Sequence, residues 1–233
     1  MSERKVDGLV CLHFEPLPGI PEDDVSAWFS KVELKPMAAL LPQESATAAR
    51  YQATGSQTPG WMILYDVDSD TQLTAGISPQ QVGSGKEMSG ICLSRRTYNL
   101  IGTAIAPETS VADLPGKYLI TASFEIAPEN EVDFNAWYDQ EHMAMVARIP
   151  GWKRGRRYRL VDAQQIVNGQ ELAPTKLPPK YLAIHELDNG NFEQSAEMGE
   201  ARGTEWAQRV IKGAIRREVR TFRLQESRGG ETK

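Results

Sequence analysis

Cysteine and histidine are scarce in this sequence, which has two of the first and three of the second among its 233 residues. Cys11 and Cys92 lie far apart without CxxC spacing, so they predict neither a disulfide framework nor a zinc site. The histidines, at positions 13, 142 and 185, show no HxH or HxxxH spacing, and we expect no bound metal. Unpaired thiols are typical of a reducing compartment, so a cytoplasmic location is expected.

Long apolar runs and nucleotide-binding or hydrolase motifs are also missing. No stretch approaches the roughly 18 consecutive apolar residues that span a bilayer. The N-terminal run MSERKVDG lacks the apolar core of a signal peptide, so no membrane partner is expected. Nothing matches GxGxxG, a P-loop, GxSxG or HExxH, so neither nucleotide-dependent nor serine-hydrolase chemistry is supported.

Positive charge is limited, since the net charge is −5. This balance argues against a nucleic-acid partner, which would need its phosphates neutralised. One basic cluster alternates along a predicted strand and is interpreted as a solvated face, with anion binding as the alternative: Lys153, Arg154, Arg156, Arg157 and Arg159.

An internal repeat organises the chain. Residues 9–15, LVCLHFE, match residues 119–125, LITASFE, and each run precedes a turn and the acidic start of a helix. Further matches follow in the same order: Ala27-Trp28-Phe29 with Ala136-Trp137-Tyr138, Arg50-Tyr51 with Arg157-Tyr158, residues 59–65 with 179–185, and residues 96–100 with 220–224. Several matches in one order are hard to explain without a duplication.

The second copy predicts the order strand, helix, strand, strand, helix, strand. Its two helices are expected at about 131–149 and about 191–213. In the first copy the segment 76–90 is rich in glycine, which disfavours a helix, so we interpret that copy as degenerate and structural. The expected boundaries are a first repeat over residues 1–104, a linker over 105–116, a second repeat over 117–226 and a disordered tail over 227–233.

The first strands indicate how the two copies pack. A four-stranded βαββαβ sheet has helices on one face only, so its other face needs a second layer. Val10, Leu12 and Phe14 are expected on one face of the first strand, and Leu9, Cys11, His13 and Glu15 on the other. We therefore expect an α+β fold in which two ferredoxin-like βαββαβ repeats form a pseudo-twofold α+β barrel.

One segment of the second copy carries a family resemblance. It runs from Phe134-Asn135-Ala136-Trp137-Tyr138-Asp139-Gln140-Glu141-His142-Met143 through Ile149-Pro150-Gly151-Trp152 to Arg156-Arg157-Tyr158. This segment resembles the dimeric α/β-barrel superfamily and, more narrowly, EthD-like proteins. The resemblance implies a ferredoxin-like fold and a possible homodimer. It does not decide the reaction, because the superfamily includes isomerases, lyases, decarboxylases, cofactor-free oxygenases, haem enzymes and proteins without known activity.

His142 is the leading candidate for chemistry. It lies at helical spacing in an apolar stripe with Phe134, Tyr138, Val146 and Ile149. Beside aromatic rings and a carboxylate, a histidine can act as a general acid or base near neutral pH, whereas the alternative is a core histidine bound to a backbone carbonyl. Counting from the shared tryptophan, the first copy has Phe29 and Glu33 in place of Tyr138 and His142, so a single site is expected, in the second copy.

Other residues are assigned to the same site. Tyr138 is predicted to assist His142 or to pack with its hydroxyl at the pocket mouth. The expected substrate-binding residues are Phe134, Tyr158, His185, Thr121 and Ser123. Glu141 is expected to pair with a surface lysine or arginine.

The predicted function is that of a cofactor-independent enzyme on a small, apolar aromatic or polyketide-like metabolite. His142 would assist a proton transfer that leads to cyclisation, isomerisation, decarboxylation or elimination. One alternative is a cofactor-free monooxygenase. Another is a stress-type or ligand-binding barrel without turnover.

Overall fold

The computed structural model describes residues 6–21, 23–24, 47–67, 90–168, 170–174 and 176–228. Three expectations concern the rest of the chain. The predicted first helix with Trp28 and most of the glycine-rich segment 76–90 lie outside the described residues. So do residues 229–233 of the expected tail.

Contacts divide the chain into two units, which are described separately. The first unit consists of Met1–Asn99, Leu160–Pro178 and Leu224–Lys233, and the second of Leu100–Arg159 and Pro179–Arg223. The expected boundary near residue 104 concerns a sequence repeat and stays a prediction. So does the pseudo-twofold barrel, which concerns the placement of the two copies.

Antiparallel strands form the first unit. In spatial order they are β4 (Ile91–Ile105), β1 (Gly8–Pro16), β3 (Trp61–Val67) and β2 (Ala48–Ala53). On β1, Val10 and Leu12 of one face and Leu9 and Cys11 of the other are all buried. A strand that is apolar on both faces is typically covered on both, as here.

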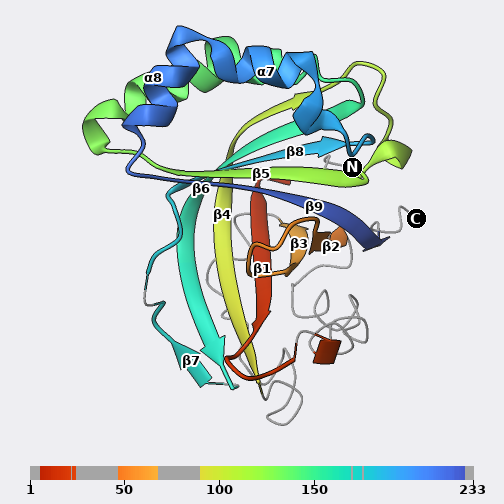
Figure 1. The fold of residues 1–233 in the computed structure, drawn as a ribbon, viewed down its shortest axis with the longest axis vertical. Helices are drawn as coiled ribbons and strands as arrows, with labels where there is room; N and C mark the ends of the chain where they lie inside the picture. The colour runs from red at the N-terminus through yellow and green to blue at the C-terminus, as the bar shows by residue number, and fades with distance from the viewer. Residues whose placement is uncertain are drawn as a thin grey trace, which may run out of the picture. The chain divides into compact units, whose positions relative to one another are not determined.

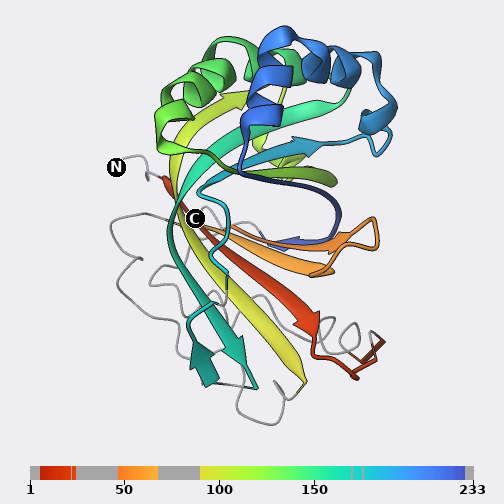
Figure 2. The same cartoon turned by 60° about the vertical axis from the view of Figure 1, so that its left-hand side comes forward.

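The second unit has the predicted order of strands and helices. Its elements are β5 (Tyr118–Glu125), α5 (Glu131–Trp137), a π-helical segment η3 (Tyr138–His142), α6 (Met143–Val146), β6 (Trp152–Val167), β8 (Tyr181–Leu187), α7 (Ala196–Gly203), α8 (Glu205–Gly213) and β9 (Arg216–Arg228). The strands lie in the order β9-β5-β8-β6. Figures 1 and 2 show α7 and α8 over one face of β5 and β8. No helix among the described residues is long and apolar enough to cross a membrane.

The same strand order and register occur in both units. If the strands of each unit are numbered along the chain, both orders read 4-1-3-2. The matched sequence segments also pair alike: Leu9 with Tyr98 and Leu119 with Phe222, Phe14 with Trp61 and Phe124 with Tyr181, Arg50 with Ile63 and Arg157 with Ala183. A duplication predicts this equality, although the equality alone does not establish one.

Both predicted helices of the second unit are interrupted. The first changes from α to π geometry at Tyr138, and the second is divided at Thr204. The Thr204 hydroxyl accepts a hydrogen bond from the Ala207 N–H at 3.0 Å, which caps the start of α8. It also donates to Glu141 at 2.6 Å, so Glu141 binds a threonine instead of the expected lysine or arginine.

The basic run on β6 is only in part the solvated face that its alternation suggested, since Arg159 is exposed but the middle of the run is buried. Arg156 and Arg157 are only 7% and 4% exposed. Arg154 is paired with Glu186, itself buried, and Arg157 with Asp139. Buried charges require partners, and acidic side chains of neighbouring elements supply them. This pairing could not be seen in the strand's own sequence.

Candidate functional site

A small cavity lies within the second unit, between the helices and the sheet. Its volume is about 40 Å³, room for a water molecule or two. The lining, here named the histidine cavity, is apolar, aromatic and basic: Ile120, Ala122, Phe124, Trp137, Tyr138, His142, Val146, His185, Met198, Arg202, Ile211, Arg217 and Val219. None of these described lining residues is acidic.

The π-helical segment positions His142. The Met143 N–H bonds to the Tyr138 carbonyl, five residues back, where an α-helix would bond four back. Trp137, Tyr138 and His142 consequently meet at the cavity. The His142 ring stacks on Trp137 with centroids 4.1 Å apart and meets Tyr138 edge-on at 5.1 Å. Single π turns of this kind often occur at functional sites.

His142 is neutral in this environment. Burial, together with smaller electrostatic contributions from His185, Arg202 and Arg217, lowers its pKa to about 3. A hydrogen bond from the ring to the backbone of Ala201 acts in the opposite direction. At neutral pH the neutral ring can therefore accept a proton, whereas the N–H that it retains is too weakly acidic for a general acid, which narrows the expected acid-or-base role to that of a base.

Three buried polar atoms around the cavity lack partners among the described residues: Trp137 Nε1, Tyr138 Oη and His142 Nδ1. Because Nδ1 is free, the His142 nitrogen that donates to Ala201 is Nε2. Burial also raises the pKa of Tyr138 to about 12, so its hydroxyl keeps its proton. An unpartnered buried polar atom costs about 1–3 kcal/mol. Three together indicate a place for a polar molecule.

His185 lines the same cavity but is committed to another residue. Its Nδ1 accepts a hydrogen bond from the Trp152 indole N–H at 3.2 Å. Burial lowers its pKa to about 4, so it too is neutral. His185 thus lines the cavity, but its expected role in substrate binding stays a prediction. Because its Nδ1 already accepts a hydrogen bond, His185 is better placed to form the cavity wall than to act as a base.

Arg157 holds the outer side of the π-helical segment. Its guanidinium donates to Asp139 at 2.6 Å and to Asn135 at 2.7 Å, and lies 4.3 Å from the centre of the Tyr138 ring. The expected binding residues Phe134 and Tyr158 lie around this arginine, where the space between the side chains is filled. The structure places them behind Tyr138, not in the lining of the histidine cavity.

Thr121 and Ser123 are placed elsewhere. Both are buried on β5, but they alternate with Ile120, Ala122 and Phe124, which line the cavity. Since successive strand residues point to opposite faces, these two hydroxyl side chains point away from His142.

A larger cavity in the first unit had not been expected. It measures about 140 Å³ and is lined by polar and proline side chains: His13, Glu15, Pro59, Cys92, Ser94, Arg96, Gln165, Pro174, Lys176 and Pro178. Burial raises the pKa of Cys92, and the charge of Glu15 raises it slightly more. A hydrogen bond from Gln165 to the Cys92 sulfur at 3.0 Å acts in the opposite direction but does not cancel the rise in pKa. This thiol is therefore protonated and a poor nucleophile. The sequence had offered one indication of this cavity: Cys11, His13 and Glu15 alternate along β1 and so share one of its faces.

The side chains described above fit neither a metal ion nor a haem. Among the described residues no group of three potential metal ligands comes together. The histidine cavity, at about 40 Å³, is far too small for a macrocycle, given that one water takes about 30 Å³ of liquid volume.

Sequence comparison does not place the chain in a family: no family model matches it, and no curated protein is similar to it in sequence. Solved structures do resemble it. An anthrone oxidase-like protein is 11% identical, covers 96% of this chain and 94% of its own, and has a TM-score of 0.58. A proposed monooxygenase from Fusobacterium nucleatum subsp. nucleatum is 8% identical, covers 98% of both chains and has a TM-score of 0.54.

A major regulator of staphylococcal pathogenesis is also similar, at 8% identity and a TM-score of 0.50, covering 94% of this chain and 99% of its own. At such identities only the fold is shared, and one fold serves many functions. The chain thus has the α+β fold of these proteins over nearly its whole length.

Proposed function

We propose that the second unit is a cofactor-independent enzyme that removes a proton from a small phenolic or enolisable molecule, with His142 as the base. The observation that carries this proposal is the group of unpartnered polar atoms on Trp137, Tyr138 and His142 around one cavity. A lone core histidine would have both ring nitrogens satisfied or solvated, whereas here Nδ1 is buried and has no partner in the described part of the chain.

The geometry suits proton abstraction in three ways. His142 Nδ1 offers a lone pair, while Nε2–H is held by the Ala201 backbone, which fixes the ring and its tautomer. The Trp137 N–H and the Tyr138 O–H are free to donate to the substrate oxygen on which charge develops. Burial opposes a positive His142, so the proton moves favourably only when a negative charge forms beside it.

Substrate size sets a further requirement. The cavity of about 40 Å³ admits no aromatic ring as it stands, because even benzene occupies a cavity of about 150 Å³. The half-buried side chains of Arg202 and Ile211 and the exposed side chain of Arg217 must shift to admit one. After proton removal, the carbanion can isomerise, cyclise, lose carbon dioxide or expel a leaving group.

A monooxygenase is the second candidate. The similarity to an anthrone oxidase-like protein favours it. Deprotonated anthrone can transfer electrons directly to oxygen, and the balanced outcome is anthraquinone plus water from anthrone plus O₂. No residue beyond the base is needed for the first step. A binding protein without turnover is the third candidate, and a regulator of similar fold favours it.

Anthrone separates these candidates. Under nitrogen in D₂O, NMR should show faster exchange of its C10 hydrogens with the protein than without it. Under air, oxygen uptake and anthraquinone absorbance report the oxidase reaction. His142→Ala should lower the exchange rate about 10²–10⁴-fold, the usual contribution of general base catalysis. Exchange without oxygen uptake favours an isomerase or lyase, whereas binding without exchange favours the third candidate.

Stability has to be measured in the same variants. His142→Gln retains hydrogen bonding but cannot titrate near neutral pH, so it should also lose exchange if His142 is the base. His13→Gln, in the other unit, is the matched control and should exchange normally. A lower melting temperature of His142→Ala with a normal exchange rate means that His142 is only a core residue.

We also propose that the chain arose by tandem duplication of an EthD-like unit and that it forms a homodimer. Equal strand order and register in the two units support the duplication. The Pro150-Gly151 turn supports the EthD-like resemblance, since Gly151 has a φ of +83°, which favours glycine. Sedimentation equilibrium of the full chain tests the dimer.

A further inference from the structure

Two arginines in the lining of the histidine cavity differ from several arginines of the second unit in their ion pairing. Arg202 from α7 and Arg217 from β9 both line it, and among the described residues neither is paired with a carboxylate. Other arginines of this unit have such partners: Arg148 with Glu200, Arg154 with Glu186, Arg157 with Asp139 and Arg209 with Asp133.

The two guanidiniums also affect each other and the base. Arg202 lowers the pKa of Arg217, second to burial as a cause, and both lower the pKa of His142. Arg217 lies 5.9 Å from the centre of the Phe124 ring, a cation–π contact that offsets part of the repulsion. The cavity therefore has two positive charges, two neutral histidines and, among the described lining residues, no negative charge.

We propose that Arg202 and Arg217 bind an anionic oxygen of the ligand, a carboxylate or a phenolate carried on an apolar ring. This assignment rests on the proposed function in one respect, namely that the ligand occupies the histidine cavity. Binding of an anion by the two arginines does not require His142 to act as a base. A bound anion replaces the missing carboxylate, and Arg binds such oxygens with two parallel hydrogen bonds. The ring then contacts the apolar wall formed by Ile120, Ala122 and Phe124.

This arrangement has a consequence for the reaction. A base with a depressed pKa works only if the charge left on the substrate is stabilised. Two guanidiniums at the cavity serve that purpose for an oxyanion conjugated with the reacting carbon. They also select acidic substrates over neutral ones of equal shape, because only the acid neutralises the arginine pair.

Benzoate and benzamide test the proposal, since they have nearly the same shape and differ in charge. Calorimetric titration of the full chain at pH 7 should give benzoate an affinity at least about tenfold higher, the effect of one charge-assisted hydrogen bond. Arg202→Gln and Arg217→Gln should each remove most of this preference while changing benzamide affinity little. The lysine variants, which keep the charge, should retain part of it.

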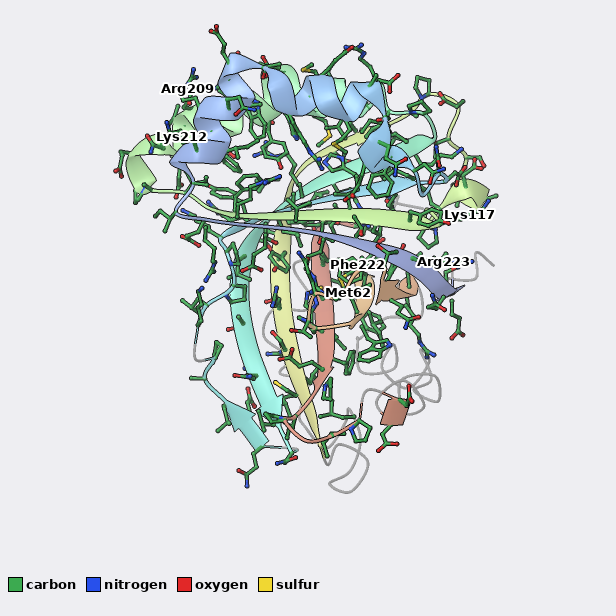
Figure 3. All side chains as sticks on the ribbon, viewed as in Figure 1. Met62, Lys117, Arg209, Lys212, Phe222 and Arg223 are labelled. Atoms are coloured by element: carbon green, nitrogen blue, oxygen red, sulfur yellow. The ribbon has the colours of Figure 1, made fainter. Side chains whose placement is uncertain are left out.

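Arg209→Gln is the matched control. Arg209 lies on α8 (Figure 3), is paired with Asp133 and does not belong to the cavity lining. Its benzoate preference should match that of the unsubstituted chain. Equal binding of benzoate and benzamide, or an equal loss in Arg209→Gln, overturns the proposal. His142→Gln should keep the preference, since it changes no charge at pH 7. In this variant, loss of proton exchange supports the proposed function and an intact benzoate preference supports the arginine site, so each proposal can fail without the other.

Discussion

His142 and His185 are neutral inside the folded second unit, whereas in the unfolded chain both bind protons below about pH 6.5. Their folded pKa values are about 3 and about 4. Between these values and 6.5 the unfolded state holds more protons, so the free energy of unfolding must fall as the pH falls. Each histidine contributes at most about 1.4 kcal/mol per pH unit.

Urea unfolding at pH 7, 6 and 5 measures this slope above the range in which carboxylates titrate. His142→Gln and His185→Gln should each flatten it. An unchanged slope in both variants contradicts the neutral, buried state of these residues.

Gly155 is the residue at which the packing around His185 leaves no room for a side chain. A Cβ there would lie 2.6 Å from Met143 Sδ, 3.0 Å from Trp152 Cζ2 and 3.1 Å from His185 Nδ1. The methionine can move, but the two hydrogen-bonded rings cannot move independently. Gly155→Ala should therefore destabilise the fold by about 1–3 kcal/mol. Gly102→Ala is the control, because its Cβ meets Arg157 only at 3.8 Å and beyond. Urea midpoints of the two variants should differ accordingly.

At the scale of elements, the contact between β6 and the π-helical segment determines the shape of the site. Arg157 of β6 binds Asn135 on α5 and Asp139 in the π segment, and only 4% of it is exposed. Arg157→Lys keeps the charge but loses the planar pair of donors. We expect a loss of about 1–3 kcal/mol in unfolding free energy, with a changed near-ultraviolet circular dichroism from Tyr138. Arg148→Lys, in an exposed pair with Glu200, should cost less than about 0.5 kcal/mol. Similar losses in both variants contradict this role for Arg157.

At the scale of the whole molecule, we expect chemistry without a prosthetic group. The histidine cavity has no room for a macrocycle, and no three metal ligands meet among the described residues. The purified full chain should show no Soret band, no flavin absorbance and no stoichiometric metal by elemental analysis. Haem titration should produce no saturable spectral change. A haem spectrum at one equivalent contradicts the proposed mechanism and favours a haem enzyme instead.

Local patterns were sufficient to predict much of this protein. Alternation along β1 and β5 predicted these strands. The sequence repeat matched segments of the two units, and in the structure the matched segments pair with their neighbouring strands in the same register. Strand pairing preserves sequence order and side-chain period, so matched sequences imply matched ladders. The helical spacing also predicted that Tyr138 and His142 face inward together, and both line one cavity.

Other features depend on residues far apart in the sequence. The burial of Arg156 and Arg157 follows from acidic groups on neighbouring elements, which nothing on their own strand reveals. Thr121 and Ser123 point away from His142 because the helices cover the opposite face of β5. Arg202 and Arg217 come from different elements, α7 and β9, and line one cavity with Ile120 and His142, which lie at least 60 positions earlier in the chain. Charge and burial act through space, so the chemistry of the cavity was decided only when the second unit folded.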